Sequence, residues 1–181
     1  MLFRGGDGGV EELVLVRYYH KDSEPMKSIS ALSKQEAEQL AKKLLIQSDC
    51  RAHRRFGAGF MNYYQERIKA EQWLYHQFSA LGGKPELQHP LYFVLQPNHL
   101  RENFGDVREV RLSLREIEET EVSFTFGDSM ANWFEGAKPK LILKHELLAR
   151  IKACGSVEAF LKTAEAFDYI EAQLWTDRFS K

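Results

Sequence analysis

The chain has 181 residues, of which 44% are hydrophobic, 12% aromatic and 28% charged, and its formal net charge is −1. This length fits one domain with a sizeable core, and the composition is typical of a globular protein and excludes a disordered chain. The near-neutral charge excludes a general attraction to nucleic acid or to membrane surfaces.

The cysteines and the N-terminal segment indicate where the protein works. Cys50 and Cys154 are far apart in the sequence and form no Cys-x-x-Cys motif, which favours free thiols in a reducing compartment. The first apolar run is short and follows acidic residues, whereas a signal peptide has a basic start and a longer apolar core. No stretch approaches the ~20 apolar residues of a membrane span. We therefore expect a cytoplasmic protein without membrane contact, with residues 1–11 as a flexible N-terminus.

The first half of the chain predicts one strand and two helices. Residues 12–19, "ELVLVRYY", are rich in β-branched and aromatic residues and predict a strand. Ser33 and Glu36 form a capping box in "SKQE", so a helix should run from there to about Gln47.

The longest helix is expected somewhere between Arg54 and Leu81, before the glycines of "GGKP". Apolar residues recur there at roughly helical spacing. The residues expected to be buried are Phe60, Tyr64, Ile68, Leu74 and Phe78, and those expected to be exposed are Glu66, Lys69 and Gln72.

The second half is richer in strands. Apolar runs or apolar alternation predict strands at 91–95, 108–114, 121–126 and 168–175, with a short one at 141–143. Two helices, "KHELLARIKAC" closed by Gly155 and "VEAFLKTAEAF" capped by Ser156, should separate the last two strands. The segments 97–106 and 127–140 are expected to be loops. Because the first strand needs partners from the second half, we expect one α+β domain, 1–181, with a mostly antiparallel central sheet packed against the long helix.

The last expected strand carries the most informative side chains. In "FDYIEAQLW", residues 167–175, one face is apolar and the other presents Tyr169, Glu171, Gln173 and Trp175. Aromatic neighbours make a site less polar and shift the pKa of a carboxyl group. If that face lines a cleft, Glu171 could orient a ribose hydroxyl or stabilise an oxocarbenium-like centre. The alternative is a partly exposed strand with aromatic pairs across the sheet.

Other constellations have weaker interpretations. The basic cluster "RAHRR", residues 51–55, could contact phosphates, with the following tyrosines for stacking, or could be a solvated helix start. "FTFGDS", residues 124–129, is typical of a turn in which Asp and Ser bond the local backbone. The six histidines show no metal-binding spacing, so no metal is expected.

Three segments resemble a family of small, uncharacterised bacterial proteins. The segments are "GGKPELQHPLYFVL", "VRLSLREIEETEVSFTFGDS" and "DYIEAQLW". The family carries similar "GGKP…HP-YF-L", "FTYGDS" and "YIE-Q-W" blocks in this order, and the resemblance covers roughly residues 56–177. It implies a group of relatives and no particular activity.

The order of expected elements also resembles the ADP-ribosyltransferase-like fold, in which a small split sheet surrounds a nicotinamide-dinucleotide pocket. The resemblance implies that Glu171 on the late strand is the catalytic glutamate. The family usually has Glu or Gln two residues before that position, where this chain has Tyr169. The residues then expected to bind the cofactor are Arg17 and His20 on the first strand, Tyr92 and Ser123 on middle strands, and Gln173 and Trp175 on the last.

The sequence therefore leaves three functional hypotheses. The first is an NAD-binding ribosyl-transfer protein, whose small-molecule partner is a nucleotide. The second is a non-enzymatic module that binds a protein partner through Trp133, Phe134 and the aromatic residues of the last strand. The third, less favoured, is a weak RNA-associated protein that uses residues 51–55. The first requires Glu171 to face a concave pocket together with Arg17 or His20.

Overall fold

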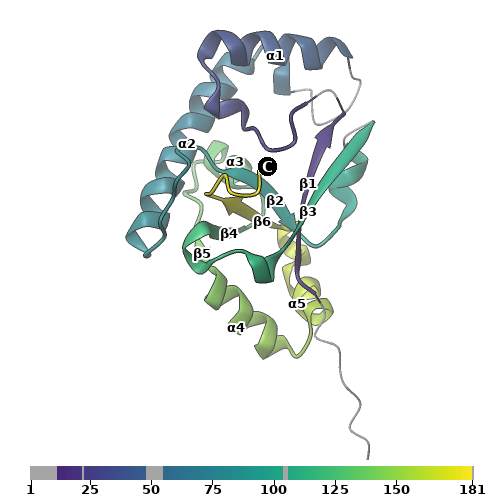
Figure 1. Cartoon of the computed structure of the whole chain (residues 1–181), viewed down its shortest axis with the longest axis vertical. Coiled ribbons are helices and arrows are strands. Elements are labelled where there is room, and N and C mark those ends of the chain that lie inside the picture. The colour runs from purple at the N-terminus through teal and green to yellow at the C-terminus, as the bar shows by residue number, and fades with distance from the viewer. Residues whose placement is uncertain (1–11, 22, 48–54, 104–105, 181) are drawn as a thin grey trace, which may run out of the picture.

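The computed structural model describes residues 12–21, 23–47, 55–103 and 106–180, so the expected flexible N-terminus, 1–11, lies outside the described residues. Six strands of this part form one antiparallel sheet in the order β3-β1-β2-β6-β4-β5 (Figure 1). The strands are β1 Val14–His20, β2 Leu91–Leu95, β3 Val107–Ser113, β4 Val122–Phe126, β5 Ile142–Leu143 and β6 Ile170–Leu174. The expected α+β class, with an antiparallel sheet and a single domain, is confirmed.

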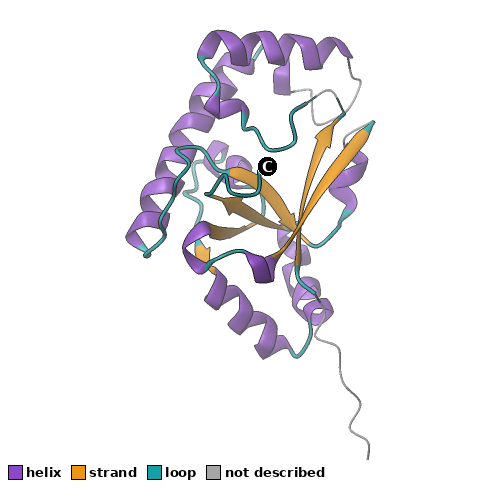
Figure 2. Ribbon diagram, viewed as in Figure 1, coloured by secondary structure: helices purple, strands orange, loops and turns teal. Residues whose placement is uncertain are grey.

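The sheet splits between β1 and β2. β1 is in register with β3 at seven positions, but with β2 only at Leu15 and Val16. Beyond Val16 the β1–β3 pair extends away from the other strands toward α1, the helix Lys34–Gln47 (Figure 2). The expected pairing of the first strand with later strands is thus confirmed, and the split leaves space beside β1 that side chains from other elements line.

One face of the sheet is apolar and covered by two helices, α4 Lys144–Cys154 and α5 Val157–Ala164. Ile170, Ala172 and Leu174 of β6 lie in this core, as their alternation along the strand predicts. Gly155 closes α4 with φ 83°, and the Ser156 hydroxyl accepts a hydrogen bond from the first turn of α5.

The other face packs against the long helix α2, Phe60–Ala80, and α1 crosses the N-terminal half of α2 (Figure 1). Phe60, Leu74 and Phe78 are buried as expected. The other expectations for this helix hold in part, because Tyr64, Ile68 and Glu66 are half-buried while Lys69 and Gln72 are exposed. The stripe of α2 that faces the sheet also contains two charged residues, Arg67 and Glu71, which the apolar pattern did not predict.

Two expected loops contain helical turns. The segment 127–140 holds α3, Ser129–Phe134, whose N-terminus is capped by the Asp128 carboxylate through the N–H groups of Met130 and Ala131. A 3₁₀ helix, His99–Asn103, lies in the segment 97–106. Gly127 joins β4 to α3 with φ 79°, a conformation that favours glycine. The prediction of plain loops was therefore wrong, because short helices leave too few residues to show a period.

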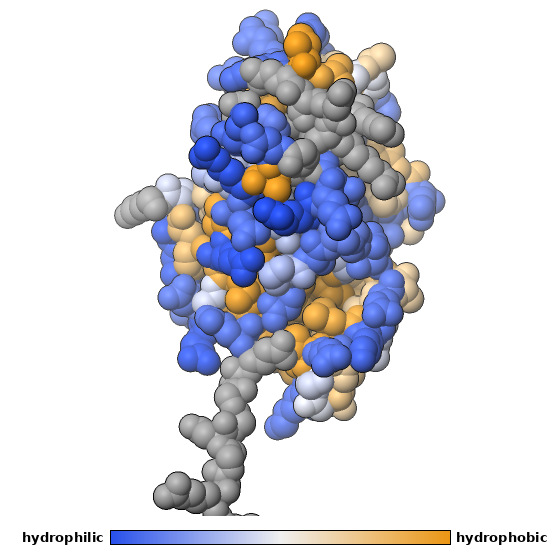
Figure 3. All heavy atoms as spheres, turned by 90° about the vertical axis from the view of Figure 1, so that its right-hand side faces the viewer, coloured by the Kyte–Doolittle hydropathy of each residue, from blue (hydrophilic) through white to orange (hydrophobic). Residues whose placement is uncertain are grey.

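The edge strand β3 exposes Arg108, Glu109 and Arg111 to solvent. Hydrophilic residues also predominate over the central part of the side of the molecule seen in Figure 3. Charged side chains on an edge strand disfavour pairing with the edge of another sheet. Across the described ranges, no helix combines the length and the apolar character that crossing a membrane would require.

Candidate functional site

A cavity of about 650 Å³ lies at the split in the sheet. Its walls come from β1 and the loop after it, from α1, from the start of α2, from β2 and β6, and from α3. Glu171, Arg17 and His20 all line it. The first hypothesis required this concave setting, and the flat, solvent-exposed alternative for Glu171 does not apply, because its side chain is 6% exposed.

Glu171 is held by one of its two carboxylate oxygens. Oε1 accepts hydrogen bonds from the Ser129 hydroxyl at 2.5 Å, from Gln173 Nε2 at 2.9 Å and, at longer range, from the Ser129 N–H and the Thr125 hydroxyl. Oε2 accepts no hydrogen bond from the described residues, although Glu171 lines the cavity. The side chain therefore presents one fixed oxygen to the protein and one free oxygen to a ligand.

The surroundings of Glu171 favour its neutral form. Burial raises the pKa of Glu171, and so does the negative charge of Asp128; the hydrogen bonds from Ser129 and Gln173 oppose them, and the pKa comes to about 8. Near neutral pH this pKa favours the protonated carboxyl group. A displaced carboxyl pKa in a cavity is typical of functional sites.

Three of the expected cofactor-binding residues, Ser123, Gln173 and Trp175, do not line the cavity. Trp175 is fully buried and stacks on Phe78 of α2 with ring centroids 5.5 Å apart. It therefore cannot form a wall of the cleft, as the strand alternation suggested, because α2 covers that end of the strand. Ser123 and Gln173 are also fully buried, and they connect Trp175 to Glu171 by hydrogen bonds.

The remaining expected residues surround the cavity. Tyr169 lines it beside Glu171 and hydrogen-bonds to Asp128, and burial raises the pKa of Tyr169. His20 lines it from the end of β1. The Arg17 guanidinium also lines it, but donates to three backbone carbonyls, those of Pro25, Lys27 and Tyr92. Arg17 thus fixes the loop after β1 against β2 and leaves part of its donor set for a ligand.

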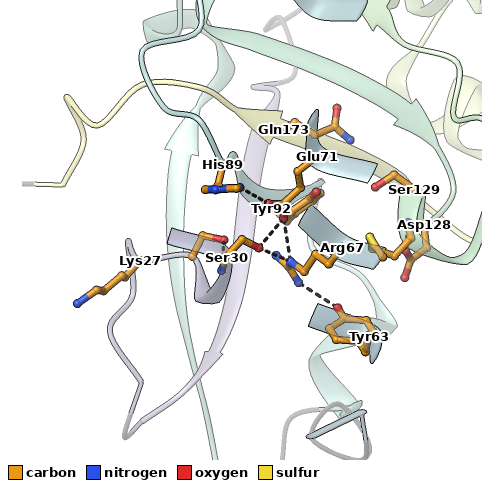
Figure 4. Close-up of polar contacts among 12 residues, drawn as sticks. Lys27, Ser30, Tyr63, Arg67, Glu71, His89, Tyr92, Asp128, Ser129 and Gln173 are labelled. Carbon is orange, nitrogen blue, oxygen red and sulfur yellow. Dashed lines mark hydrogen bonds and ion pairs between the residues drawn. The ribbon is translucent and has the colours of Figure 1, made fainter. Parts of the chain in front are cut away.

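Sequence reasoning missed a second buried polar group, which we call the α2 cluster: Ser30, Tyr63, Arg67, Glu71 and His89 (Figure 4). Arg67 Nε lies 2.8 Å from Glu71 Oε1, and the guanidinium also donates to the Ser30 and Tyr63 hydroxyls. His89 Nδ1 lies 2.7 Å from Glu71 Oε2. Burial opposes the charge of Arg67, but Tyr63 and Glu71 outweigh it and keep the Arg67 pKa well above its usual value.

A signal for this cluster was present in the sequence. Arg67 and Glu71 follow Phe60 and precede Leu74 and Phe78 at spacings of seven, four, three and four residues, so they share the buried stripe of α2. Charged residues in an apolar stripe must be paired when they are buried. The contribution of His89 had no such signal, because it comes from the segment before β2.

The Tyr92 hydroxyl is the one buried side-chain polar atom of the described residues that has no hydrogen-bond partner. Tyr92 lines the cavity from β2, and the Arg67 guanidinium lies over its ring at 4.8 Å from the centroid. Burial raises the pKa of Tyr92 well above its usual value, and the charge of Glu71 adds to this. Leaving this buried hydroxyl unpaired costs free energy, so Tyr92 carries an unsatisfied polar group in the wall of the cavity.

The cavity carries more positive than negative side chains. Its described lining has five lysines and arginines, Arg17, Lys27, Lys43, Arg55 and Arg67, against Glu24, Asp128 and Glu171. Burial lowers the pKa of Arg17 to about 10, and repulsion from Arg67 and Arg55 contributes. Burial would raise the pKa of Tyr63, but the charges of Arg67 and Arg55 outweigh it and lower that pKa. These mutual effects indicate that three guanidinium groups gather on one side of the cavity, where an anion would offset their repulsion.

The structure also places residues of the two alternative hypotheses, an RNA-associated protein and a module that binds a protein partner. Of the cluster 51–55, only Arg55 belongs to the described residues, and its guanidinium lies over the rings of Phe56 and Tyr63. Trp133 is half-buried and donates to Glu66, and Phe134 is 50% exposed and stacks on Tyr63 at the cavity. Of the aromatic residues expected to anchor a protein partner, Trp175 is excluded because it lies in the core, whereas Tyr169 is half-buried.

The described residues contain no group of three or more His, Cys, Asp or Glu side chains that could hold a metal ion. No family model, curated protein or solved structure matches the chain. What the protein does must therefore be inferred from the cavity itself: a half-satisfied buried carboxyl group, an unpaired tyrosine hydroxyl and a wall of guanidinium groups.

Proposed function

We propose that the protein binds a nicotinamide dinucleotide in this cavity and transfers its ribosyl group. The observation that carries the proposal is the free Oε2 of Glu171 in a cavity that Arg17, Arg55 and Arg67 also line. A ligand that suits both the carboxyl group and the guanidinium groups needs a positive centre and a negative group in one molecule. Oxidised NAD has both, since its nicotinamide ring is cationic and its diphosphate is anionic.

The arrangement of the site agrees with such a ligand. β2 lies between the strand of Arg17 and the strand of Glu171 in the sheet order, so the two side chains reach the cavity from different strands. The cavity opens where β1 leaves β2, which agrees with the split sheet of the ADP-ribosyltransferase-like fold. The half-exposed ring of Phe134 offers a stacking surface at the same cavity.

The proposed chemistry uses Glu171 as a charge partner. When the glycosidic bond breaks, its electron pair leaves with nicotinamide, and positive charge develops on the ribose carbon until a nucleophile adds to that carbon. A carboxylate beside this centre stabilises the transition state more than the ground state. Because the pKa of Glu171 is about 8 in the free protein, the positive ring has to displace a proton when it binds near neutral pH.

Calorimetric titration tests the binding. We expect oxidised NAD to bind with release of protons at pH 7, seen as a heat that depends on the ionisation enthalpy of the buffer. NADH has an uncharged nicotinamide ring, so it should bind without this release, and the preference for oxidised NAD should grow as the pH rises toward 8. No binding of either dinucleotide at millimolar concentration would overturn the proposal.

Turnover is measured as nicotinamide released from NAD. Glu171→Gln keeps the shape and loses the charge, so it should lower turnover by about 10²–10³-fold and change the dissociation constant much less. Glu158→Gln, which alters an exposed carboxylate on α5, is the matched control and should change neither quantity. If Glu171→Gln retained full turnover, Glu171 would not be the catalytic group.

A further inference from the structure

A chain of hydrogen bonds runs from the core to Glu171. Trp175 Nε1 lies 2.9 Å from Ser123 Oγ, Ser123 Oγ lies 2.9 Å from Gln173 Oε1, and Gln173 Nε2 lies 2.9 Å from Glu171 Oε1. These residues are fully buried except for Glu171, which opens onto the cavity. The cavity chemistry proposed above uses none of the first three side chains.

The donor and acceptor groups allow this series of hydrogen bonds to run in one direction, from Trp175 toward Glu171. An indole N–H can only donate, so Ser123 Oγ accepts from Trp175 and has one proton of its own to donate. That proton goes to Gln173 Oε1, which turns the amide nitrogen toward Glu171. Both N–H groups of the amide are then used, one toward Glu171 and one toward the Thr125 hydroxyl at 3.0 Å.

The direction decides which oxygen of Glu171 can carry a proton. Oε1 receives the N–H groups of Gln173 and Ser129, which can only donate, so a proton on Oε1 would face other protons. We infer that Trp175, Ser123 and Gln173 are positioning residues that fix the dissociable proton of Glu171 on Oε2, the oxygen facing the cavity. The value of this arrangement for catalysis rests on the proposed function, whereas the proton position is a property of the free protein.

The position of the proton determines which ligand atoms Glu171 Oε2 can bind. With the proton present, Oε2 donates a hydrogen bond to an acceptor atom of a ligand. With the proton gone, Oε2 faces a positive centre directly, while Oε1 keeps its donors. A cationic ligand and the proton therefore compete for the same oxygen, and the side chain does not need to turn to exchange them.

Other charged and titratable groups also face Glu171 and set its affinity for the proton. Asp128 lies at the start of α3, Tyr169 directly before β6 and Tyr92 on β2. Beyond Tyr92 lie Arg67 and Glu71 of the α2 cluster. These groups stay in place when Ser123 or Gln173 is changed, so such variants isolate the effect of the hydrogen-bond chain.

The test is a pH titration of the free protein labelled with ¹³C at the glutamate side-chain carboxyl carbons. The signal that disappears in Glu171→Gln identifies Glu171. In Ser123→Ala the Gln173 amide can turn its carbonyl toward Glu171, and in Gln173→Met the N–H donor is lost. Both variants should raise the Glu171 midpoint by about one pKa unit or more, since each removes a hydrogen bond to the charged form. Having two variants keeps the test valid if one of them does not fold.

The matched control is Thr176→Val. Thr176 is buried beyond the end of β6, and its hydroxyl bonds to Glu86, outside the chain of hydrogen bonds. This variant loses a buried hydroxyl as Ser123→Ala does, but it should leave the Glu171 midpoint unchanged. Equal midpoint shifts in the control and in Ser123→Ala, or no shift in Ser123→Ala and Gln173→Met, would overturn the inference.

Neutron diffraction on deuterated crystals at pH 6 locates the proton directly. Deuterium is expected on Glu171 Oε2, and deuterium on Oε1 would overturn the inference. Neither measurement uses a ligand, so the inference and the proposed function can fail separately. If the proton lies on Oε2 but NAD does not bind, only the ribosyl-transfer proposal is lost.

Discussion

Two buried carboxylates lie close to the same cavity and have opposite surroundings. Glu71 of the α2 cluster is 0% exposed and contacts the Arg67 guanidinium, the Ser30 hydroxyl and the His89 ring. Glu171 is 6% exposed, and its hydrogen-bond donors among the described residues are all neutral; burial raises its pKa, and the neighbouring charge of Asp128 adds to this. Glu71 is compensated by a positive charge within the protein, and Glu171 is not.

The comparison shows that burial by itself does not assign a role to a carboxyl group. A buried carboxylate with a guanidinium partner is stable within the fold and holds other residues in place. A buried carboxyl group without such a partner keeps its proton until a ligand supplies a positive charge. The α2 cluster therefore has the surroundings of a structural element of the cavity wall, and those of Glu171 agree with the proposed role toward a ligand.

The largest expected effect comes from breaking the charged pair. Arg67→Met leaves Glu71 buried without its guanidinium partner, so we expect the free energy of unfolding to fall by about 3–5 kcal/mol. Denaturant unfolding measures the loss. Lys69→Met, at an exposed position of the same helix, is the control and should change stability by less than about 0.5 kcal/mol. A loss below about 1 kcal/mol in Arg67→Met would mean that Glu71 does not depend on this partner.

The second prediction concerns the pH dependence of stability, which Glu171 should control. Its pKa of about 8 in the folded protein is above the ordinary value of a glutamate, so between the two values the folded state holds a proton that the unfolded state has lost. This favourable contribution is complete below about pH 4, falls by about 1.4 kcal/mol per pH unit as the pH rises, and is gone above about pH 8.

Glu171→Gln removes this term. Relative to the wild type, the variant should therefore gain stability as the pH rises from 5 to 8, and the difference should level off above pH 8. Urea unfolding of both proteins at one-unit pH steps measures it, with Glu158→Gln as the control that keeps the wild-type slope. A difference independent of pH would show that Glu171 is charged in the folded state at neutral pH.

The smallest expected effect on stability comes from removing the tyrosine hydroxyl of Tyr92 in the cavity wall. The Tyr92 hydroxyl has no partner, so Tyr92→Phe should leave the free energy of unfolding unchanged or raise it by about 1 kcal/mol. Tyr18 on β1 is the matched control, since its hydroxyl accepts from the Asn98 N–H at 3.1 Å, and Tyr18→Phe should cost about 1 kcal/mol. A marked loss of stability in Tyr92→Phe would mean that its hydroxyl is paired within the protein.

Some residues of the site could be predicted from the sequence, and others could not. The period of two along 168–175 identified Glu171 and its face, and the first strand was expected to bring Arg17 and His20. The stripe of α2 contained the signal for Arg67 and Glu71, because their spacing matches that of the apolar residues. Ser129 was part of a motif interpreted as a turn, and only the folded chain brings its hydroxyl to Glu171, 42 positions away.

The sequence by itself determined the longer helices and the strands, together with their apolar faces. Alternation placed Ile170, Ala172 and Leu174 in the core, and the Ser33 and Ser156 caps marked the starts of helices, because these signals act over a few residues. Only the tertiary structure decided what each polar face meets. On β6, α2 covers Trp175 and leaves Glu171 open, and Ser123 reaches Gln173 across 50 positions of sequence. The physical reason is that a local period fixes the direction of a side chain, whereas its partner depends on strand order and on the split between β1 and β2.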